Sequence, residues 1–121
     1  MYEFKKTNRI LKGYEFKHVL DSGLKVVHPN FVLYGSLHSE NRLGLIVSKK
    51  VGKAVTRNKV KRRIRESYRL RLPEMRENLG FDLVVIARNR SRKVGFQEFD
   101  RSFANCIERL QNKLTKSINE K

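Results

Sequence analysis

Residues 49–71 read KKVGKAVTRNKVKRRIRESYRLR and hold eleven lysines and arginines against a single acid, Glu66. This segment therefore carries more than half of the chain's formal net charge of +16. Such a density of one charge repels itself unless a polyanion neutralises it, which favours nucleic acid as the partner. Val60, Ile64 and Tyr68 recur every four residues, so we expect a helix with a narrow apolar stripe on the protein and a basic face toward solvent.

The ends of this helix are marked by residue types that begin and stop helices. Thr56 has the side chain of an N-cap, and we place the start of the helix there. Pro73 is predicted to stop it, because proline removes a backbone donor and restricts the residue before it. Pro73 then suits the first position of a short second helix that runs to Asn78, with Gly80 as its C-terminal cap.

The rest of the chain alternates between short strands and amphipathic helices. Apolar spacing predicts a first helix over Tyr14–Leu20, closed by Gly23, and a long last helix whose apolar face runs from Phe96 to Leu114. Strands are predicted at Leu24–His28, Phe31–Leu37, Leu43–Ser48 and Phe81–Ala87. An antiparallel meander is the simplest connection for the first three strands, and the strongly apolar fourth strand is expected at the centre of the sheet.

Length and composition place these elements in one domain. A chain of 121 residues with 39% apolar content can fill one modest core, which gives a single α+β domain of order αβββαβα, with a four-stranded sheet packed by helices. We expect residues 1–12 to form a flexible basic arm. No apolar run is long enough to cross a bilayer, and a lone cysteine fits a reducing compartment, so a cytoplasmic location without a membrane partner is expected.

The side chains that could carry catalysis are explained more simply by structure. The two closest pairs of acids, Glu74 with Glu77 and Glu98 with Asp100, each fit the first turn of a predicted helix, where negative charge is favourable. Cys106 lies on the apolar face of the last helix and is expected to be inert core. The three histidines, ten residues apart, have no helical or strand spacing; they are His18, His28 and His38. We therefore predict no catalytic residue and no metal ligand in the protein.

Binding is better supported than catalysis. Arg57, Arg62 and Arg65 can hold phosphates through two parallel hydrogen bonds, whereas lysines act as point charges. Asn58 is a poor helix former, which leaves recognition and capping as its two interpretations. Periodicity alone also leaves Phe16 and Tyr34 open, either as core residues or as platforms for unpaired bases.

The chain resembles the protein component of bacterial ribonuclease P over nearly its whole length. The resemblance rests on RILKGYEFKHVLDSG near the N-terminus, FVLY at 31–34, GLIVSKKVGKAVTRNKVKRRIRE at 44–66 and the strand FDLVVIAR. The central stretch is the family's signature, which usually holds an Arg-Asn-Arg triplet. Here Arg57, Asn58 and Lys59 take its place, which keeps the charge but loses one fork of donors.

The resemblance implies a ribonucleoprotein whose RNA subunit removes the 5′ leader of precursor tRNA with Mg²⁺, while the protein assists and binds no cofactor of its own. It implies one protein per RNA and a fold like the second domain of ribosomal protein S5, with a left-handed βαβ crossover. Together with the basic segment it assigns contacts with ribonuclease P RNA to Lys49, Lys50, Lys53, Arg57, Asn58, Lys59, Lys61, Arg62, Arg65 and Arg69. A cleft between the sheet and the first helix would take the single-stranded leader, through Phe16, Leu20, Val32 and Tyr34. The family often has an aromatic residue where this chain has Leu20.

Three other classes share some of these features. A ribosomal protein would have the charge and no active site, but it would not promote leader removal. A DNA-binding module would need a second helix at helix-turn-helix spacing, and we find none beside the basic segment. A protein nuclease would need a cluster of carboxylates or histidines that the sequence lacks.

Overall fold

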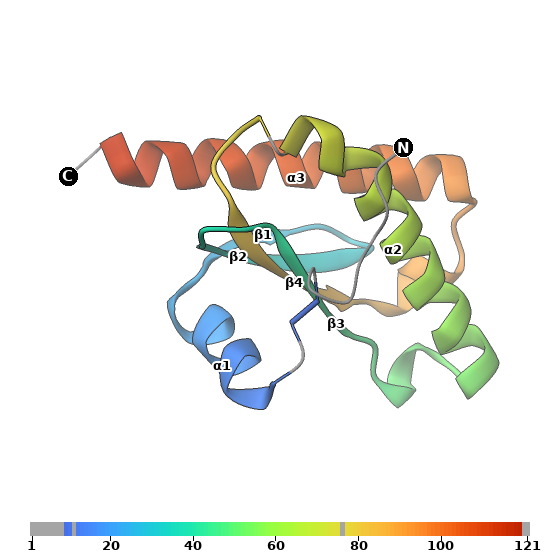
Figure 1. The fold of residues 1–121 in the computed structure, drawn as a ribbon. Coiled ribbons are helices and arrows are strands. Elements are labelled where there is room, and N and C mark those ends of the chain that lie inside the picture. The colour runs from blue at the N-terminus through green and yellow to red at the C-terminus, as the bar shows by residue number, and fades with distance from the viewer. Residues whose placement is uncertain (1–8, 11, 76, 120–121) are drawn as a thin grey trace.

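The computed structural model describes residues 9–10, 12–75 and 77–119. The elements are α1 (Gly13–Ser22), β1 (Leu24–Val27), β2 (Phe31–Leu37), β3 (Arg42–Ile46), the 3₁₀ turn η2 (Lys49–Val51), α2 (Ala54–Met75), β4 (Phe81–Ala87), the 3₁₀ turn η3 (Asn89–Arg92) and α3 (Phe96–Asn119). The four strands form one sheet, with α2 and α3 on one face and α1 on the other (Figure 1). This confirms the α+β class and the predicted order of helices and strands.

The order of the strands differs from the predicted meander. The sheet runs β1-β2-β4-β3, so β2 pairs antiparallel with β1 and β4, while β3 pairs in parallel with β4. The meander is wrong at β3, because β4 takes the place beside β2. Six of the seven residues of β4 are buried, so this strand needs neighbours on both edges, as its apolar sequence predicted.

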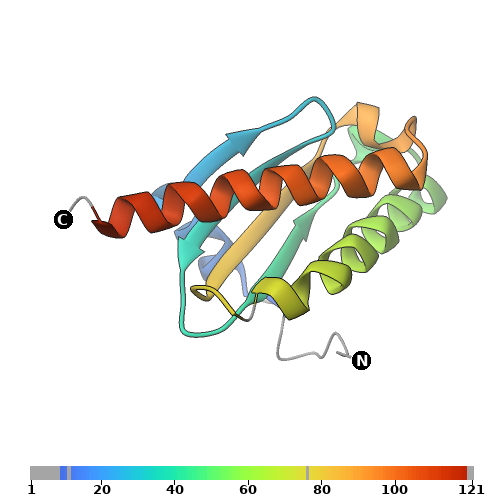
Figure 2. The same cartoon turned by 90° about the horizontal axis from the view of Figure 1, so that it is seen from above.

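The connection from β3 through α2 to β4 is a left-handed crossover. In Figure 2, seen from the side of α2 and α3, β3 and β4 run in the same direction, α2 returns on the near face, and β4 lies to the left of β3. This is the handedness that the family resemblance implied, and it is opposite to that of most parallel crossovers.

The basic helix α2 begins two residues before Thr56. The carbonyl of Lys53 already accepts the amide of Arg57 at 2.9 Å, so Thr56 lies inside the first turn and the predicted N-cap is wrong. Gly52, directly before, has a φ of 155°, a conformation open to glycine alone without strain. This sharp turn lets the helix start sooner than the side-chain signal indicated.

Pro73 does not stop α2, which continues to Met75. A proline inside a helix costs about 3 kcal/mol, but Leu72 and Met75 are fully buried, and each such side chain contributes about 1.5–3 kcal/mol. The predicted second helix from Pro73 to Asn78 is therefore wrong. Glu74 lies in the last turn of α2, so the helix N-terminus we invoked for it and Glu77 does not exist there.

The face of the sheet that α2 and α3 cover, which we call the closed face, holds the aromatic core. Phe31 from β2 meets Phe99 and Phe103 of α3 edge to face, with ring centroids 5.5 and 5.6 Å away. Val60, Ile64 and Tyr68 of α2 are buried in the same cluster, which confirms the predicted apolar stripe. Cys106 is also buried there, and burial raises the pKa of its thiol, which confirms its place in the core.

The predicted N-terminal arm lies mostly outside the described residues, which include only its last part. Arg9 forms a parallel bridge with Leu43 of β3, and the amide of Ile10 donates to the Leu43 carbonyl at 2.9 Å. The Ile10 side chain is 4% exposed and packs with Val19 and Val84 on the α1 face. The chain therefore lies along the outer edge of β3 just before it enters α1.

Candidate nucleic-acid interface

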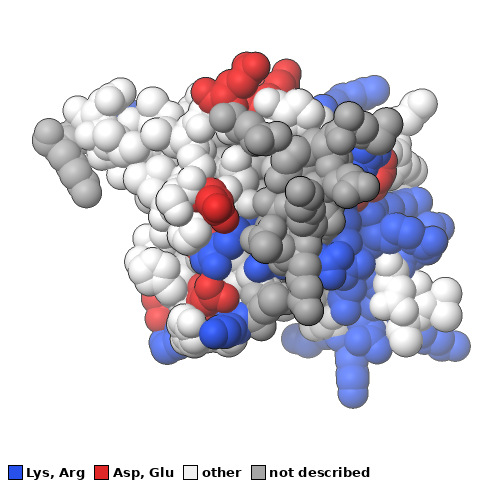
Figure 3. All heavy atoms as spheres, in the orientation of Figure 1, with Lys and Arg blue, Asp and Glu red and all other residues white. Residues whose placement is uncertain are grey.

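The basic residues of η2 and α2 form one continuous surface, seen at the right of Figure 3. We call it the basic face, and it comprises the ten residues for which RNA contact was predicted. Lys49, Lys50, Lys53, Asn58, Lys59, Arg62 and Arg65 are exposed, and Arg57, Lys61 and Arg69 are partly exposed. All ten predicted residues are thus at least partly exposed on η2, on α2 and between them, although their contact with RNA stays a prediction.

Some of these side chains are held in place by the protein itself. Arg57 donates from Nε to the Gly52 carbonyl at 3.2 Å, which ties it to the turn before α2. Arg69 binds the carboxylate of Glu66 through Nε at 3.1 Å, and this hydrogen bond lowers the pKa of Glu66. Burial, with the charge of Arg9 nearby, lowers the pKa of Arg65. A phosphate beside Arg65 would offset the second of these causes, because its negative charge would balance the two positive charges.

Two further arginines of the basic segment serve the fold. Arg63 donates to the Val94 carbonyl at 2.6 Å and so connects α2 to the segment before α3. Arg71 binds Asp100 of α3, which also accepts the hydroxyl of Ser67. Asp100 is therefore a bridge between two helices, whereas Glu98 lies in the first turn of α3 as predicted.

The second candidate surface is the α1 face of the sheet, which one short helix covers only in part. Phe16 of α1 lies directly on Gly44 of β3, where an added Cβ would come within 2.6 Å of its ring. Phe16, Leu20 and Tyr34 are partly buried around Val19 and Val84. These three predicted leader residues therefore lie together, each with part of its side chain exposed. Their structural role is now established, and leader contact stays a prediction.

The fourth predicted residue, Val32, belongs to a row that sequence reasoning missed. The strand register aligns Val27, Val32, Ile86 and Ile46 side by side across all four strands. Val27 is 50% exposed, and the other three are partly exposed. We call this row the open row. Alternation along each strand signals which residues share a face, but only the pairing shows that these four are neighbours.

Tyr34 lies in the next row, between the open row and α1. Its partner across the strands is Lys25, whose Nζ lies 5.7 Å from the centroid of the tyrosine ring. An aromatic ring with a cation above it and apolar side chains beside it can stack a base and neutralise a neighbouring phosphate. The α1 face therefore offers what an unpaired strand of nucleic acid requires.

An ion cluster fixes α1 over the sheet. Arg42 of β3 donates to both carboxylate oxygens of Asp82 at 2.7 Å and to Glu15 of α1 at 2.6 Å. Asp82 is only 5% exposed, and its hydrogen bonds are the main cause that raises the pKa of Arg42. Arg42 therefore holds the end of α1 at a set position above β4 and β3.

Among the residues described, no three histidine, cysteine or acidic side chains lie close enough to hold a metal ion. In the same part of the chain, none of the helices is long and apolar enough to cross a membrane.

Comparison with known proteins identifies the family. The Ribonuclease P family model matches residues 4–111. The ribonuclease P protein component of Clostridium botulinum (strain 657) is 44% identical over 106 residues, which cover 86% of this chain and 95% of that protein. The corresponding protein of Clostridioides difficile is 38% identical over 109 residues, 88% of this chain and 95% of its own. The RNase P protein of Staphylococcus aureus has a structure similar to this one, with a TM-score of 0.76 and 33% identity over 85% of this chain and 94% of that one.

The basic face, the half-covered sheet and these relatives together indicate a class of RNA-processing protein. The chain belongs to the family of bacterial ribonuclease P protein components. The RNase P protein of Thermotoga maritima, with a TM-score of 0.75 and 30% identity over 84% of this chain and 96% of that one, has the same fold.

Proposed function

We propose that this protein is the RNA-binding subunit of a bacterial ribonuclease P and assists its RNA in removing the 5′ leader of precursor tRNA. The observation that carries the proposal is the side-by-side placement of two surfaces. The basic face begins at Lys49, three residues after Ile46 of the open row. A nucleic acid on the basic face and an unpaired strand on the α1 face would therefore be neighbours.

The two surfaces are proposed to bind different parts of the RNA. The basic face would contact ribonuclease P RNA mainly through phosphates, because lysine and arginine side chains pair with phosphate oxygens. Phe16, Leu20, Val32 and Tyr34 would bind the leader, with the rest of the open row extending the surface. Leu20 supports stacking less than an aromatic residue would, so Tyr34 carries most of it.

Catalysis is assigned to the RNA and its Mg²⁺ ions, and the protein contributes charge neutralisation. Lysines and arginines near the cleavage site lower the cation concentration that the RNA needs to fold and to bind its substrate. The proposal includes one protein per RNA and a cytoplasmic location.

The test is cleavage of precursor tRNA at low Mg²⁺ by a bacterial ribonuclease P RNA, with and without the protein. Leader removal is expected only when both are present. Arg62→Ala should weaken binding of the RNA and reduce the slope of log affinity against log salt by about 0.7–0.9, the share of one phosphate contact. Cleavage by the protein alone would disprove the assignment of catalysis to RNA. RNA binding without stimulation would instead favour a ribosomal type of RNA-binding protein.

A further inference from the structure

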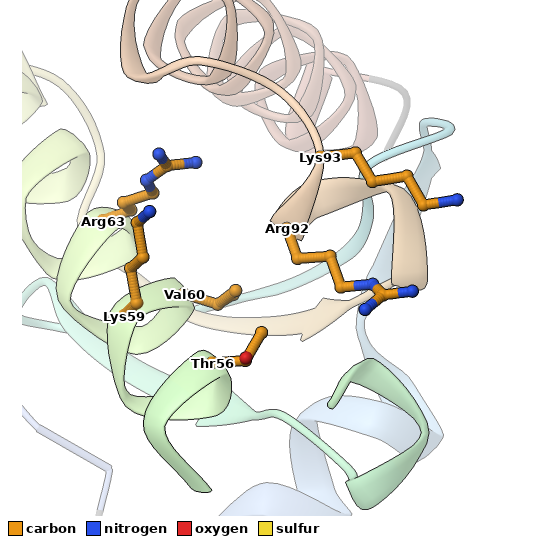
Figure 4. A pocket seen from close by; sticks show the side chains of 6 residues that line it. All are labelled: Thr56, Lys59, Val60, Arg63, Arg92 and Lys93. Atoms are coloured by element: carbon orange, nitrogen blue, oxygen red, sulfur yellow. The ribbon is translucent and has the colours of Figure 1, made fainter. Parts of the chain in front are cut away.

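A cavity lies on the side of α2 that faces α3 and η3, away from the sheet's open row. Thr56, Lys59, Val60 and Arg63 of α2 line one wall, and Arg92 and Lys93 line the other, around about 340 Å³. Figure 4 shows Lys59 and Arg63 rising from α2, with Arg92 and Lys93 on the opposite segment and their charged ends directed away from α2. Only Lys59 of this set belongs to the ten residues of the basic face.

The charges around this cavity have no acidic partner among the residues that the structure describes. Within the described part of the chain, no carboxylate lies at ion-pair distance from Lys59, Arg92 or Lys93. Arg63 uses NH1 for the Val94 carbonyl, which fixes its guanidinium at the cavity and leaves its other donors available. Four cations around one hollow favour an anion, and arginine with a threonine hydroxyl suits the oxygens of a phosphate. Lys93 and Arg92 are exposed, so their side chains can turn inward at little cost.

A second, more open hollow shares lining residues with the first and includes an aromatic side chain. It has a volume of about 430 Å³ and is lined by Lys59, Arg62, Arg63, Glu66 and Phe96. Lys59 and Arg63 line both cavities, so the two are neighbours on α2. Phe96 begins α3 and is 36% exposed, although α3 has a buried face for its other phenylalanines. An exposed phenylalanine among arginines is the arrangement that stacks an unpaired base.

Glu66 fixes the direction in which a nucleotide would lie. Glu66 lines the hollow with Phe96, and its carboxylate, which Arg69 keeps ionised, would repel a phosphate nearby. The first cavity has no acid among its lining residues. A phosphate is therefore favoured between Lys59 and Lys93, with its base on Phe96.

From this arrangement we propose a nucleotide-binding site formed by α2, η3 and the start of α3, which takes one unpaired nucleotide of an RNA strand. It lies on the opposite side of α2 from the leader surface, so it would bind a different part of the RNA from the leader. The inference rests on the proposed function only in taking RNA as the partner.

The test is an NMR titration of the full chain with three probes: adenosine 5′-monophosphate, inorganic phosphate and an unstructured RNA hexamer of adenosine and cytidine. The nucleotide and the hexamer should shift the Phe96 ring and the Arg63 side chain together, whereas phosphate should shift Arg63 alone. Phosphate acting as strongly as the nucleotide, with Phe96 unmoved by all three, would overturn the site as one for nucleotides. Tighter binding of the hexamer than of the mononucleotide would identify a strand, and equal binding would overturn RNA as the occupant.

Two variants test the two halves separately. Phe96→Ala should weaken hexamer binding at this site about tenfold, the usual loss of one stacked base, with Phe96→Tyr restoring it. Arg92→Ala with Lys93→Ala should reduce the salt slope by about 1.4, for two contacts with a single strand. Arg101→Ala with Lys113→Ala removes the same charge from exposed positions on α3 and should leave the Phe96 and Arg63 shifts intact. Equal losses of hexamer binding from both double variants would mean that binding depends on net positive charge and not on this site.

These outcomes are separate from those of the proposed function. A wild-type protein that stimulates leader removal but gives no Phe96 response would leave the proposed function standing and remove this site. A wild-type protein that fails to stimulate but binds the hexamer at Phe96 would do the reverse.

Discussion

The two faces of the sheet are formed by the same strands but are covered by helices to different extents. On the closed face, Phe31 and Leu33 of β2 are fully buried under α2 and α3. On the α1 face, Val32 and Tyr34 of the same strand remain partly exposed, because α1 covers only part of it. Alternate residues of one strand can thus be divided between stability and binding, so that each face can be changed almost alone.

The largest effect is expected on the closed face. Phe103→Ala would remove a ring that packs on Phe31 and Phe99 and is not exposed at all. The free energy of unfolding should fall by about 3–5 kcal/mol, as for other buried phenylalanines. Urea unfolding measures it, with Phe103→Leu as the milder control. A loss below 1 kcal/mol would mean that the closed face is not the main source of stability.

The second-largest effect on stability is expected at Arg42, which joins α1 to the sheet. Arg42→Ala would leave the carboxylate of Asp82 buried without its partner, at a cost of about 3 kcal/mol, the lower end for a broken buried pair. Arg42→Lys keeps the charge but loses the planar guanidinium that binds both oxygens of Asp82 as well as Glu15, so it should recover only part of the stability. Because Arg42 positions α1, leader binding should weaken in both variants. Unchanged leader binding would mean that the position of α1 does not matter for binding the leader.

On the α1 face the effect should be on binding. Tyr34→Ala should reduce affinity for leader-bearing precursor tRNA about tenfold, since a stacked base contributes about 1–3 kcal/mol. Leaderless tRNA should bind as before, and Tyr34→Phe should keep most of the affinity. Equal losses for both substrates would contradict leader binding at this face.

The smallest effect concerns pH at the edge of the closed face. The His28 ring stacks on Phe31 at 5.2 Å, and burial, followed by the charges of Arg109 and Arg90, lowers its pKa. The unfolded chain then binds this proton more readily, so stability is fully present above the ordinary value of 6.5 and declines as pH falls toward the lowered value.

His28→Asn should remove this pH dependence and keep an acceptor for the backbone amide of Asn30. In the wild-type protein this amide donates to Nδ1 of the histidine ring at 3.0 Å. Thermal unfolding from above pH 6.5 downward, on both proteins, measures the difference. Identical pH profiles would assign the decline to other groups. Glu66 should not interfere, because its lowered pKa moves its loss of stability to more acidic pH.

Prediction from sequence worked where a local pattern repeats. It failed where residues far apart in the sequence determine a helix end or a strand neighbour. The period of four gave the buried stripe of α2, and the apolar run of β4 gave its central place. Thr56 and Pro73 misled because burial of Leu72 and Met75 and the turn at Gly52 outweigh local signals. Val27, Ile46 and Ile86 were missed because strands far apart in sequence must first be paired.

The basic segment and the family can be read from the sequence alone, because charge, residue type and a long motif are properties of neighbouring residues. The strand order, the open row and the two hollows that share Lys59 and Arg63 follow from the tertiary structure alone. Each of these joins segments that the chain brings together through the crossover of α2, and no local pattern specifies which segments will meet. The fold therefore decides which residues share a surface, and the sequence decides what those surfaces can bind.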